Sequence, residues 1–165
     1  MLNTSLNGAY IMFKPRYNQA QLDRWLEKIQ GTDEITFGAS TAGYQVEGGI
    51  NGPRDPKNNW YPAEHNAKAQ ITGKCADFWN RSSEDLSRSS WLGLQAFRLG
   101  IEWTRLQPCF APDTNETPHF SNEAAEHYAR IIAHIFSQGM FPAVTLHHFT
   151  NPLWAGLDFW LDRER

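Results

Sequence analysis

Apolar residues along the chain fall into three short runs separated by two amphipathic stretches. The runs span residues 35–42, 94–103 and 141–146, and their apolar and β-branched content predicts three buried strands. Residues 75–90 and 122–138 carry apolar side chains at helical spacing, which predicts two helices. Strands and helices that alternate with short connections predict right-handed crossovers and a parallel sheet.

Two α/β architectures begin with such units, the doubly wound sheet and the eight-stranded barrel. No glycine-rich phosphate-binding turn follows the first run, which weighs against the nucleotide-binding version of the doubly wound sheet. The barrel is therefore favoured, and a small doubly wound protein stays the alternative.

The segments outside this pattern differ in character. Residues 1–33 form an N-terminal extension, within which residues 18–31 predict a short amphipathic helix. Its mixed polar face favours a helix docked on the main domain over a helix on a membrane surface. Residues 50–74 are rich in Asn, Gly and Pro and predict a long functional loop, and residues 153–165 begin a further helix or loop.

Composition narrows the class of protein. The 165 residues are 41% apolar and 13% aromatic, which indicates a globular domain with its own core. A net charge of −3 with both signs interspersed argues against a nucleic-acid partner. There is no secretory signal pattern and no long apolar window, and Cys75 and Cys109 form no Cys-x-x-Cys pair. We therefore expect a cytoplasmic protein with two reduced thiols and no membrane partner.

The histidines predict neither a metal site nor a cofactor. His127 and His134 are seven residues apart on one helix, whereas two ligands of one ion stand three or four apart. His65 and His119 lie in separate loops. Seven tryptophans instead suit a sugar or an aromatic ligand, although most tryptophans in proteins simply pack.

Three segments of the chain resemble a known family, in the family's own order. Phe37–Gly48, Phe97–Arg105 and Thr145–Phe149 look like the first three strand motifs of family 1 glycoside hydrolases, the β-glucosidase and β-galactosidase type. The loop Asp55–Tyr61 is most similar to the archaeal β-glycosidase branch of that family. The resemblance implies that residues 34–165 are the first part of a TIM barrel, its N-terminal three βα units.

The resemblance also implies a retaining mechanism and a set of site residues. In such a mechanism one carboxylate attacks the anomeric carbon, while another protonates the leaving oxygen and then activates water. Gln45 and His148 would hydrogen-bond hydroxyls of a β-glycoside or oligosaccharide in the innermost subsite, and Trp103 would help to wall it. Arg98 would lie against the nucleophile and keep it ionised. Glu47 would anchor the residues around the sugar rather than touch it.

The chemistry of these side chains supports the assignments without deciding them. Gln and His can each donate to and accept from a hydroxyl, but Gln45 could instead cap loop backbone and His148 could be a buried histidine bonded to backbone. That second interpretation is favoured for His147. Arg98 lies in an apolar strand, where a guanidinium requires a partner, so a functional role is favoured for it.

The sequence departs from the family in one respect. The family places its two catalytic glutamates in a Thr-x-Asn-Glu-Pro segment after the fourth strand and a Thr-Glu-Asn-Gly segment after the seventh, and neither segment occurs here. Thr114–Pro118 resembles the first, but Thr117 precedes its proline and it follows the second strand, so Glu116 is interpreted as a solvated loop residue. We therefore expect a truncated, inactive part of a β-glycosidase whose catalytic glutamates lie beyond Arg165.

An incomplete barrel has two consequences for the predicted function. Three strands leave unpaired sheet edges, through which the chain could self-associate. A chain without the catalytic glutamates could also be a non-catalytic sugar-binding or interaction module derived from the barrel, which is the alternative function.

Overall fold

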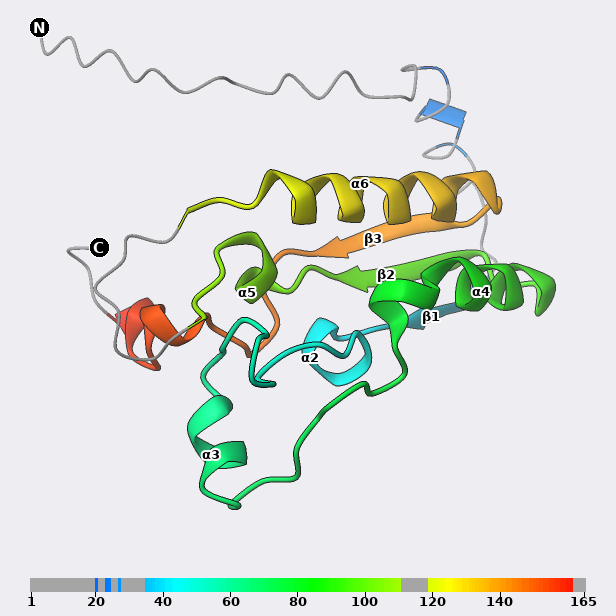
Figure 1. Cartoon of the computed structure of the whole chain (residues 1–165). Coiled ribbons are helices and arrows are strands. Elements are labelled where there is room, and N and C mark those ends of the chain that lie inside the picture. The colour runs from blue at the N-terminus through cyan, green and yellow to red at the C-terminus, as the bar shows by residue number, and fades with distance from the viewer. Residues whose placement is uncertain (1–19, 21–22, 25–26, 28–34, 111–118, 162–165) are drawn as a thin grey trace, which may run out of the picture. The chain divides into compact units, whose positions relative to one another are not determined.

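Parallel strands form the centre of the computed structural model, which describes residues 20, 23, 24, 27, 35–110 and 119–161. The chain divides into two units, Met1–Glu34 and Ile35–Arg165, and each is described by itself. In the second unit the described strands are β1 (Gly38–Ser40), β2 (Ala96–Gly100) and β3 (Phe141–Thr145), in the sheet order β1-β2-β3 (Figure 1). Both pairings are parallel, so the parallel sheet predicted from the sequence is confirmed.

Two long helices cover one face of this sheet (Figure 1). They are α4 (Phe78–Trp91) and α6 (Asn122–Ser137), and the Ser121 hydroxyl caps α6 by accepting the Ala124 N–H at 3.2 Å. Phe97 and Leu99, two residues apart on β2, face the helices and are buried. The core joins them to residues of both helices and of the turn before β3: Phe78, Leu86, Tyr128, Ile131, Ile135 and Met140.

The strands are shorter than the apolar runs predicted. The run 35–42 pairs only over β1, and the chain then turns into the short helix α2 (Gly43–Val46). The run 94–103 pairs only over β2, because the Glu102 side chain accepts the Thr104 N–H at 3.4 Å and begins the helix α5 (Trp103–Leu106). Apolar content alone does not separate a strand from the turn that follows it.

Two other boundaries differ from expectation for local reasons. The helix predicted from residue 75 begins at Phe78, since Cys75 and Asp77 have positive φ values of 48° and 56°. The loop 50–74 contains the short helix α3 (Tyr61–His65). The segment after β3, predicted as helix or loop, forms the 3-10 turns Leu153–Ala155 and Phe159–Leu161.

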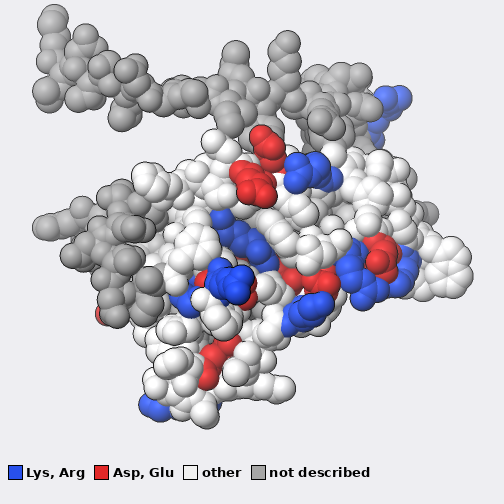
Figure 2. All heavy atoms as spheres, viewed as in Figure 1, with Lys and Arg blue, Asp and Glu red and all other residues white. Residues whose placement is uncertain are grey.

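Part of what the sequence predicts lies outside the described residues. In the expected helix over 18–31, the described positions are Ala20, Asp23, Arg24 and Glu27, which are helical and exposed. The apolar stripe of that helix and the segment Thr114–Pro118 lie outside them. No described helix is long and apolar enough to cross a membrane. On the face drawn in Figure 2, basic and acidic side chains are interspersed over the described surface.

Candidate functional site

The loops that follow the strands meet at the carboxyl edge of the sheet. The loop after β1 carries Tyr44, the loop after β2 carries Trp103, and the loop after β3 carries His147 and Phe149. The Tyr44 and Phe149 rings are in edge contact with centroids 6.3 Å apart, and the Trp103 and His147 rings lie 6.4 Å apart. The structure therefore brings together the three segments that the sequence singled out.

Gln45 and His148 are the predicted sugar contacts. Gln45 has an exposed side chain on α2, and its backbone N–H donates to the Ala42 carbonyl at 3.0 Å. His148 is half-buried, and its ring lies 5.0 Å from that of Phe149, the next residue. The residues next to them in the chain, Tyr44 and Phe149, are in ring contact with each other.

His147 was interpreted from the sequence as a buried histidine bonded to backbone, and this interpretation is wrong. The residue is exposed, and its Nε2 pairs with the Asn151 side-chain oxygen at 2.9 Å. The reason is that β3 ends at Thr145, so His147 lies in the loop beyond the cover of the helices. Among the described residues, no three His, Cys, Asp or Glu side chains are grouped so that they could hold a metal ion.

Arg98 stands in the middle of β2 and is half-buried. One terminal nitrogen, Nη2, donates a long hydrogen bond of 3.4 Å to the Thr41 carbonyl. Its Nε is buried and has no hydrogen-bond partner within the described part of the chain. A buried guanidinium N–H without an acceptor is costly, so this position favours an additional anionic or carbonyl partner.

Aromatic rings form two groups around these residues. Trp103 packs against the segment after β3, and its indole N–H donates to the Gln107 side-chain oxygen at 2.6 Å. Its ring neighbours there are Trp154, Phe159 and Trp160 at 5.5, 5.1 and 5.9 Å. In the second group Trp60 stacks on Tyr44 at 5.9 Å and meets Phe149 edge-on at 6.4 Å. Trp60 lies in the loop 50–74, which the sequence predicts to be functional, but no sequence pattern indicates that it contacts the loop after β3.

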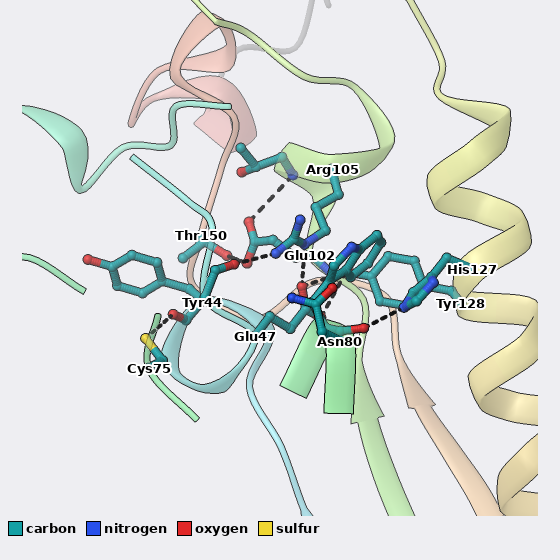
Figure 3. Close-up of polar contacts among 12 residues, drawn as sticks. Tyr44, Glu47, Cys75, Asn80, Glu102, Arg105, His127, Tyr128 and Thr150 are labelled. Carbon is teal, nitrogen blue, oxygen red and sulfur yellow. Dashed lines mark hydrogen bonds and ion pairs between the residues drawn. The ribbon is translucent and has the colours of Figure 1, made fainter. Parts of the chain in front are cut away.

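Glu47 follows α2 in the loop after β1, and its carboxylate is buried among the polar contacts drawn in Figure 3. Its side chain is 1% exposed, and it accepts from Arg105 Nε at 2.5 Å and from the Tyr128 hydroxyl at 2.9 Å. Burial raises the pKa of Glu47 to about 7, and the charge and hydrogen bond of Arg105 and the hydrogen bond of Tyr128 oppose that rise. The carboxylate is therefore closed to solvent and bonded to its own chain.

The contacts of Glu47 extend into the other two loops. The Tyr128 hydroxyl accepts the Glu102 backbone N–H at 3.0 Å, and the Glu102 carboxylate accepts from the Thr150 hydroxyl at 2.8 Å. Arg105 also donates to the Gly48 carbonyl. We name Glu47, Glu102, Arg105, Tyr128 and Thr150 the loop network. Among these residues only Glu47 was predicted from the sequence, although Glu102 and Arg105 lie inside the second family motif.

A second buried carboxylate, Glu64, lies on α3 and is 5% exposed. It accepts from the Tyr44 hydroxyl at 2.5 Å, the Thr72 hydroxyl at 2.6 Å and the Asn51 side-chain N–H at 2.9 Å. Burial alone would raise the pKa of Glu64, but these hydrogen bonds hold it below its usual value. Burial and the neighbouring Glu64 raise the pKa of Tyr44, which therefore stays protonated as the donor.

Comparison of the sequence with protein families gives a direct match. The model of glycosyl hydrolase family 1 matches residues 28–156. The 6-phospho-beta-galactosidase 1 of Streptococcus pneumoniae strain R6 is 33% identical over 134 residues, which cover 79% of this chain and 27% of that protein. The chain therefore spans about a quarter of the length of this curated relative.

Comparison of the structure points the same way. A beta-glycosidase from Pyrococcus horikoshii is 34% identical with a TM-score of 0.60, over 75% of this chain and 27% of that one. Aphid myrosinase is 25% identical with a TM-score of 0.62, again over 75% of this chain and 27% of that one. These neighbours are TIM-barrel glycosidases, so the expectation of three βα units from such a barrel is confirmed. The chain belongs to glycosyl hydrolase family 1.

Proposed function

We propose that the protein containing this chain hydrolyses β-glycosidic O-linkages with retention, and that the chain supplies part of the sugar subsite. The observation that carries the proposal is the meeting of the three family motifs at one edge of the sheet, through the Tyr44–Phe149 and Trp103–His147 ring contacts. In TIM-barrel enzymes that edge holds the active site. Retention requires two carboxylates on opposite sides of the glycosidic bond.

Gln45 and His148 are assigned to the sugar hydroxyls. Each side chain can donate and accept, which suits a hydroxyl that does both. The exposure of Gln45 and the position of His148 beside the Tyr44–Phe149 contact support this assignment. Trp103 supplies an aromatic wall on the side of the segment after β3.

Arg98 and Glu47 are assigned supporting roles. A guanidinium beside the nucleophilic carboxylate keeps that carboxylate ionised, because the opposite charge favours the charged form. The unpartnered Nε of Arg98 supports this role, since a further acceptor would satisfy it. Glu47 holds the loop that carries Gln45 through its bonds to Arg105 and Tyr128.

The catalytic carboxylates are proposed to be two glutamates outside these 165 residues. Neither family segment that carries them occurs in the sequence. The buried acids of the described structure are unsuited to the chemistry, because Glu47, Glu64 and Glu102 are 1%, 5% and 2% exposed and hydrogen-bonded to their own chain. The isolated chain is therefore expected to cleave no glycoside.

A chimeric barrel tests the proposal. Residues 35–156 replace the matching segment of the Streptococcus pneumoniae relative, and hydrolysis of nitrophenyl β-galactoside, β-glucoside and their 6-phosphates is measured. We expect turnover by the chimera and a loss of about a hundredfold in kcat/KM for its His148→Ala variant, against no loss for the exposed His119→Ala control.

Three results would count against the proposal. A folded chimera without turnover contradicts the hydrolytic role, and equal losses for both histidine variants contradict the role of His148. Hydrolysis by the isolated chain contradicts the location of the catalytic glutamates. Saturable sugar binding by the isolated, folded and monomeric chain, measured by calorimetry, would instead favour a non-catalytic sugar-binding module.

A further inference from the structure

The hydroxyl group of Tyr128 joins loops that are far apart in the sequence. It donates to the Glu47 carboxylate, with oxygens at 2.9 and 3.0 Å, and it accepts the Glu102 backbone N–H at 3.0 Å. Glu47 stands 81 residues before Tyr128, and Glu102 stands 26 before it. One buried hydroxyl on α6 therefore holds the loops after β1 and after β2 at the same time (Figure 3).

Thr150 brings the third loop into the same network. Its hydroxyl donates to the Glu102 carboxylate at 2.8 Å, and its backbone N–H donates to the His148 carbonyl at 2.8 Å. Thr150 and Glu102 are 4% and 2% exposed, so neither bond competes with bulk water. The Tyr128 hydroxyl thus contacts the loops after β1 and β2 directly, and the loop after β3 is linked to it through Glu102.

Each loop pairs a buried network residue with a more accessible residue assigned to the sugar. Glu47 lies two residues after Gln45, Glu102 lies immediately before Trp103, and Thr150 lies two residues after His148. Glu47, Glu102 and Thr150 are buried, whereas Gln45 is exposed and Trp103 and His148 are half-buried. The loop network therefore holds, from beneath the surface, the backbone segments that carry Gln45, Trp103 and His148.

The hydroxyl is not needed for apolar packing. The Tyr128 ring lies in the core between the helices and meets the Trp79 ring edge-on at 5.3 Å, a position that a phenylalanine ring would fill equally well. Burial and the charge of Glu47 raise the pKa of Tyr128 well above its usual range, so the group remains a donor at all ordinary pH values. What the hydroxyl adds is the pair of polar contacts.

We propose that Tyr128 is a positioning residue, whose hydroxyl fixes the three loops carrying Gln45, Trp103 and His148 in register with one another. The role in sugar recognition rests on the proposed function, whereas the coupling of the loops does not. Removal of the hydroxyl leaves the Glu102 N–H and one Glu47 acceptor position unsatisfied. Within the loop network, the loops after β1 and β2 are then joined by the Arg105 bonds alone, so their register loosens.

Amide hydrogen exchange of the 165-residue chain tests the coupling. Measured relative to the Leu99 amide, which reports the loss of global stability, the Tyr128→Phe variant is expected to exchange about tenfold faster at the Glu47, Arg105 and Thr150 amides together. The Leu99 amide in β2 is the internal reference. A purely structural role would speed exchange at Leu99 by the same factor, and that result, or unchanged exchange in the loops, would overturn the proposal.

Two further variants separate the coupling from general loss of stability. Tyr61→Phe is the matched control, because it removes a tyrosine hydroxyl from α3, outside the loop network, and should leave all four amides unchanged. Thr150→Val removes only the link to the third loop, so it should speed exchange at Thr150 and leave Glu47 unchanged. This variant also decides the question if Tyr128→Phe does not fold, since equal acceleration at Thr150 and Glu47, or none at either, would contradict a branched network.

The chimeric barrel tests the second part of the proposal, that Tyr128 positions the residues assigned to the sugar. Tyr128→Phe in the chimera is expected to lower kcat/KM by about tenfold, because three sugar contacts lose their common register, while Tyr61→Phe has no effect. Coupled exchange without any change in kcat/KM would overturn positioning of the sugar contacts. An inactive parent chimera would instead overturn the proposed function, and the exchange result would still decide the coupling.

Discussion

Glu47 and Glu64 are both buried carboxylates in the loops of this sheet, yet their surroundings shift their pKa values in opposite directions. Glu47 has a cationic partner, Arg105, and its pKa is raised to about 7. Glu64 has only neutral donors among its hydrogen-bond partners, and its pKa is lowered. The sign of a neighbouring charge therefore does not decide the direction of the shift.

The opposite pKa shifts depend on how deeply each carboxylate is buried and on how many hydrogen-bond donors it has. Glu47 lies among α2, α5 and the core helix α6, where loss of hydration outweighs Arg105. Glu64 is covered by residues of the surrounding loops, and three side-chain donors replace the water it loses. A carboxylate is kept ionised by enough well-placed donors, whereas the deep ion pair of Glu47 offsets only part of its cost of burial.

Loss of the Glu47 carboxylate is expected to have the largest effect, because it breaks the ion pair and leaves Arg105 buried beside it. The Glu47→Ala variant should lose about 3–5 kcal/mol of unfolding free energy in urea titration at pH 7.5. The matched control is Glu84→Ala on the exposed face of α4, which should show no measurable loss. A loss as small as that of the control would mean that Arg105 finds other acceptors and that Glu47 anchors nothing.

The raised pKa of Glu47 predicts a pH dependence of the same residue. A carboxyl group whose folded pKa lies above its unfolded value stabilises the fold below the unfolded pKa, and that contribution is lost as pH rises through about 7. The wild-type chain should therefore lose about 3 kcal/mol relative to Glu47→Gln between pH 4 and pH 8, in urea titrations. Parallel curves for the two proteins would show that Arg105 cancels the effect of burial.

The architecture around both carboxylates was predictable from the chain, but their partners were not. Alternation of apolar runs and amphipathic stretches predicted the parallel sheet, and the helical stripe placed Tyr128 on the buried face of α6. No pattern indicates that its hydroxyl meets Glu47, because the two residues are 81 positions apart and come together only when the sheet forms. The same limit applies to Glu64, whose donors lie 8 to 20 residues away.

Local chemistry explains the remaining errors. The run ending at Trp103 looked like one strand, since its apolar content continues through Ile101, but the Glu102 side chain caps a helix there. His147 looked like a core histidine because it follows an apolar run, but the strand ends two residues earlier. The structure places Gln45 on α2 after β1, Arg98 on β2 and His148 in the loop after β3. Their roles at a sugar stay a prediction of the family motifs.

Glu64 provides the opposite test of pH dependence. Its lowered pKa means that its contribution is fully present above the usual pKa of 4.5 and is lost as pH falls through the folded value. Glu64→Gln turns an amide N–H toward one of three donors and should cost about 1–3 kcal/mol at pH 6. The cost should shrink in urea titrations toward pH 3, whereas the exposed Glu126→Gln on α6 should show no such trend. A cost that grows in acid would place Glu64 in the same class as Glu47.

The smallest expected effect is the difference in stability cost between removing the Tyr44 hydroxyl, which donates to Glu64, and removing the Tyr128 hydroxyl, which donates to Glu47. Tyr44→Phe removes one of three side-chain donors to Glu64 and keeps the ring contacts with Trp60 and Phe149, so it should cost about 1 kcal/mol. Tyr128→Phe removes a donor and also strands the Glu102 N–H, so it should cost about twice as much in the same urea titration. Equal costs would mean that the Glu102 N–H finds another acceptor once the hydroxyl is gone. In that case the deep burial of Glu47 would account for the whole difference between the Glu47 and Glu64 sites. The hydrogen bonds by which Tyr128 joins two loops would contribute nothing to it.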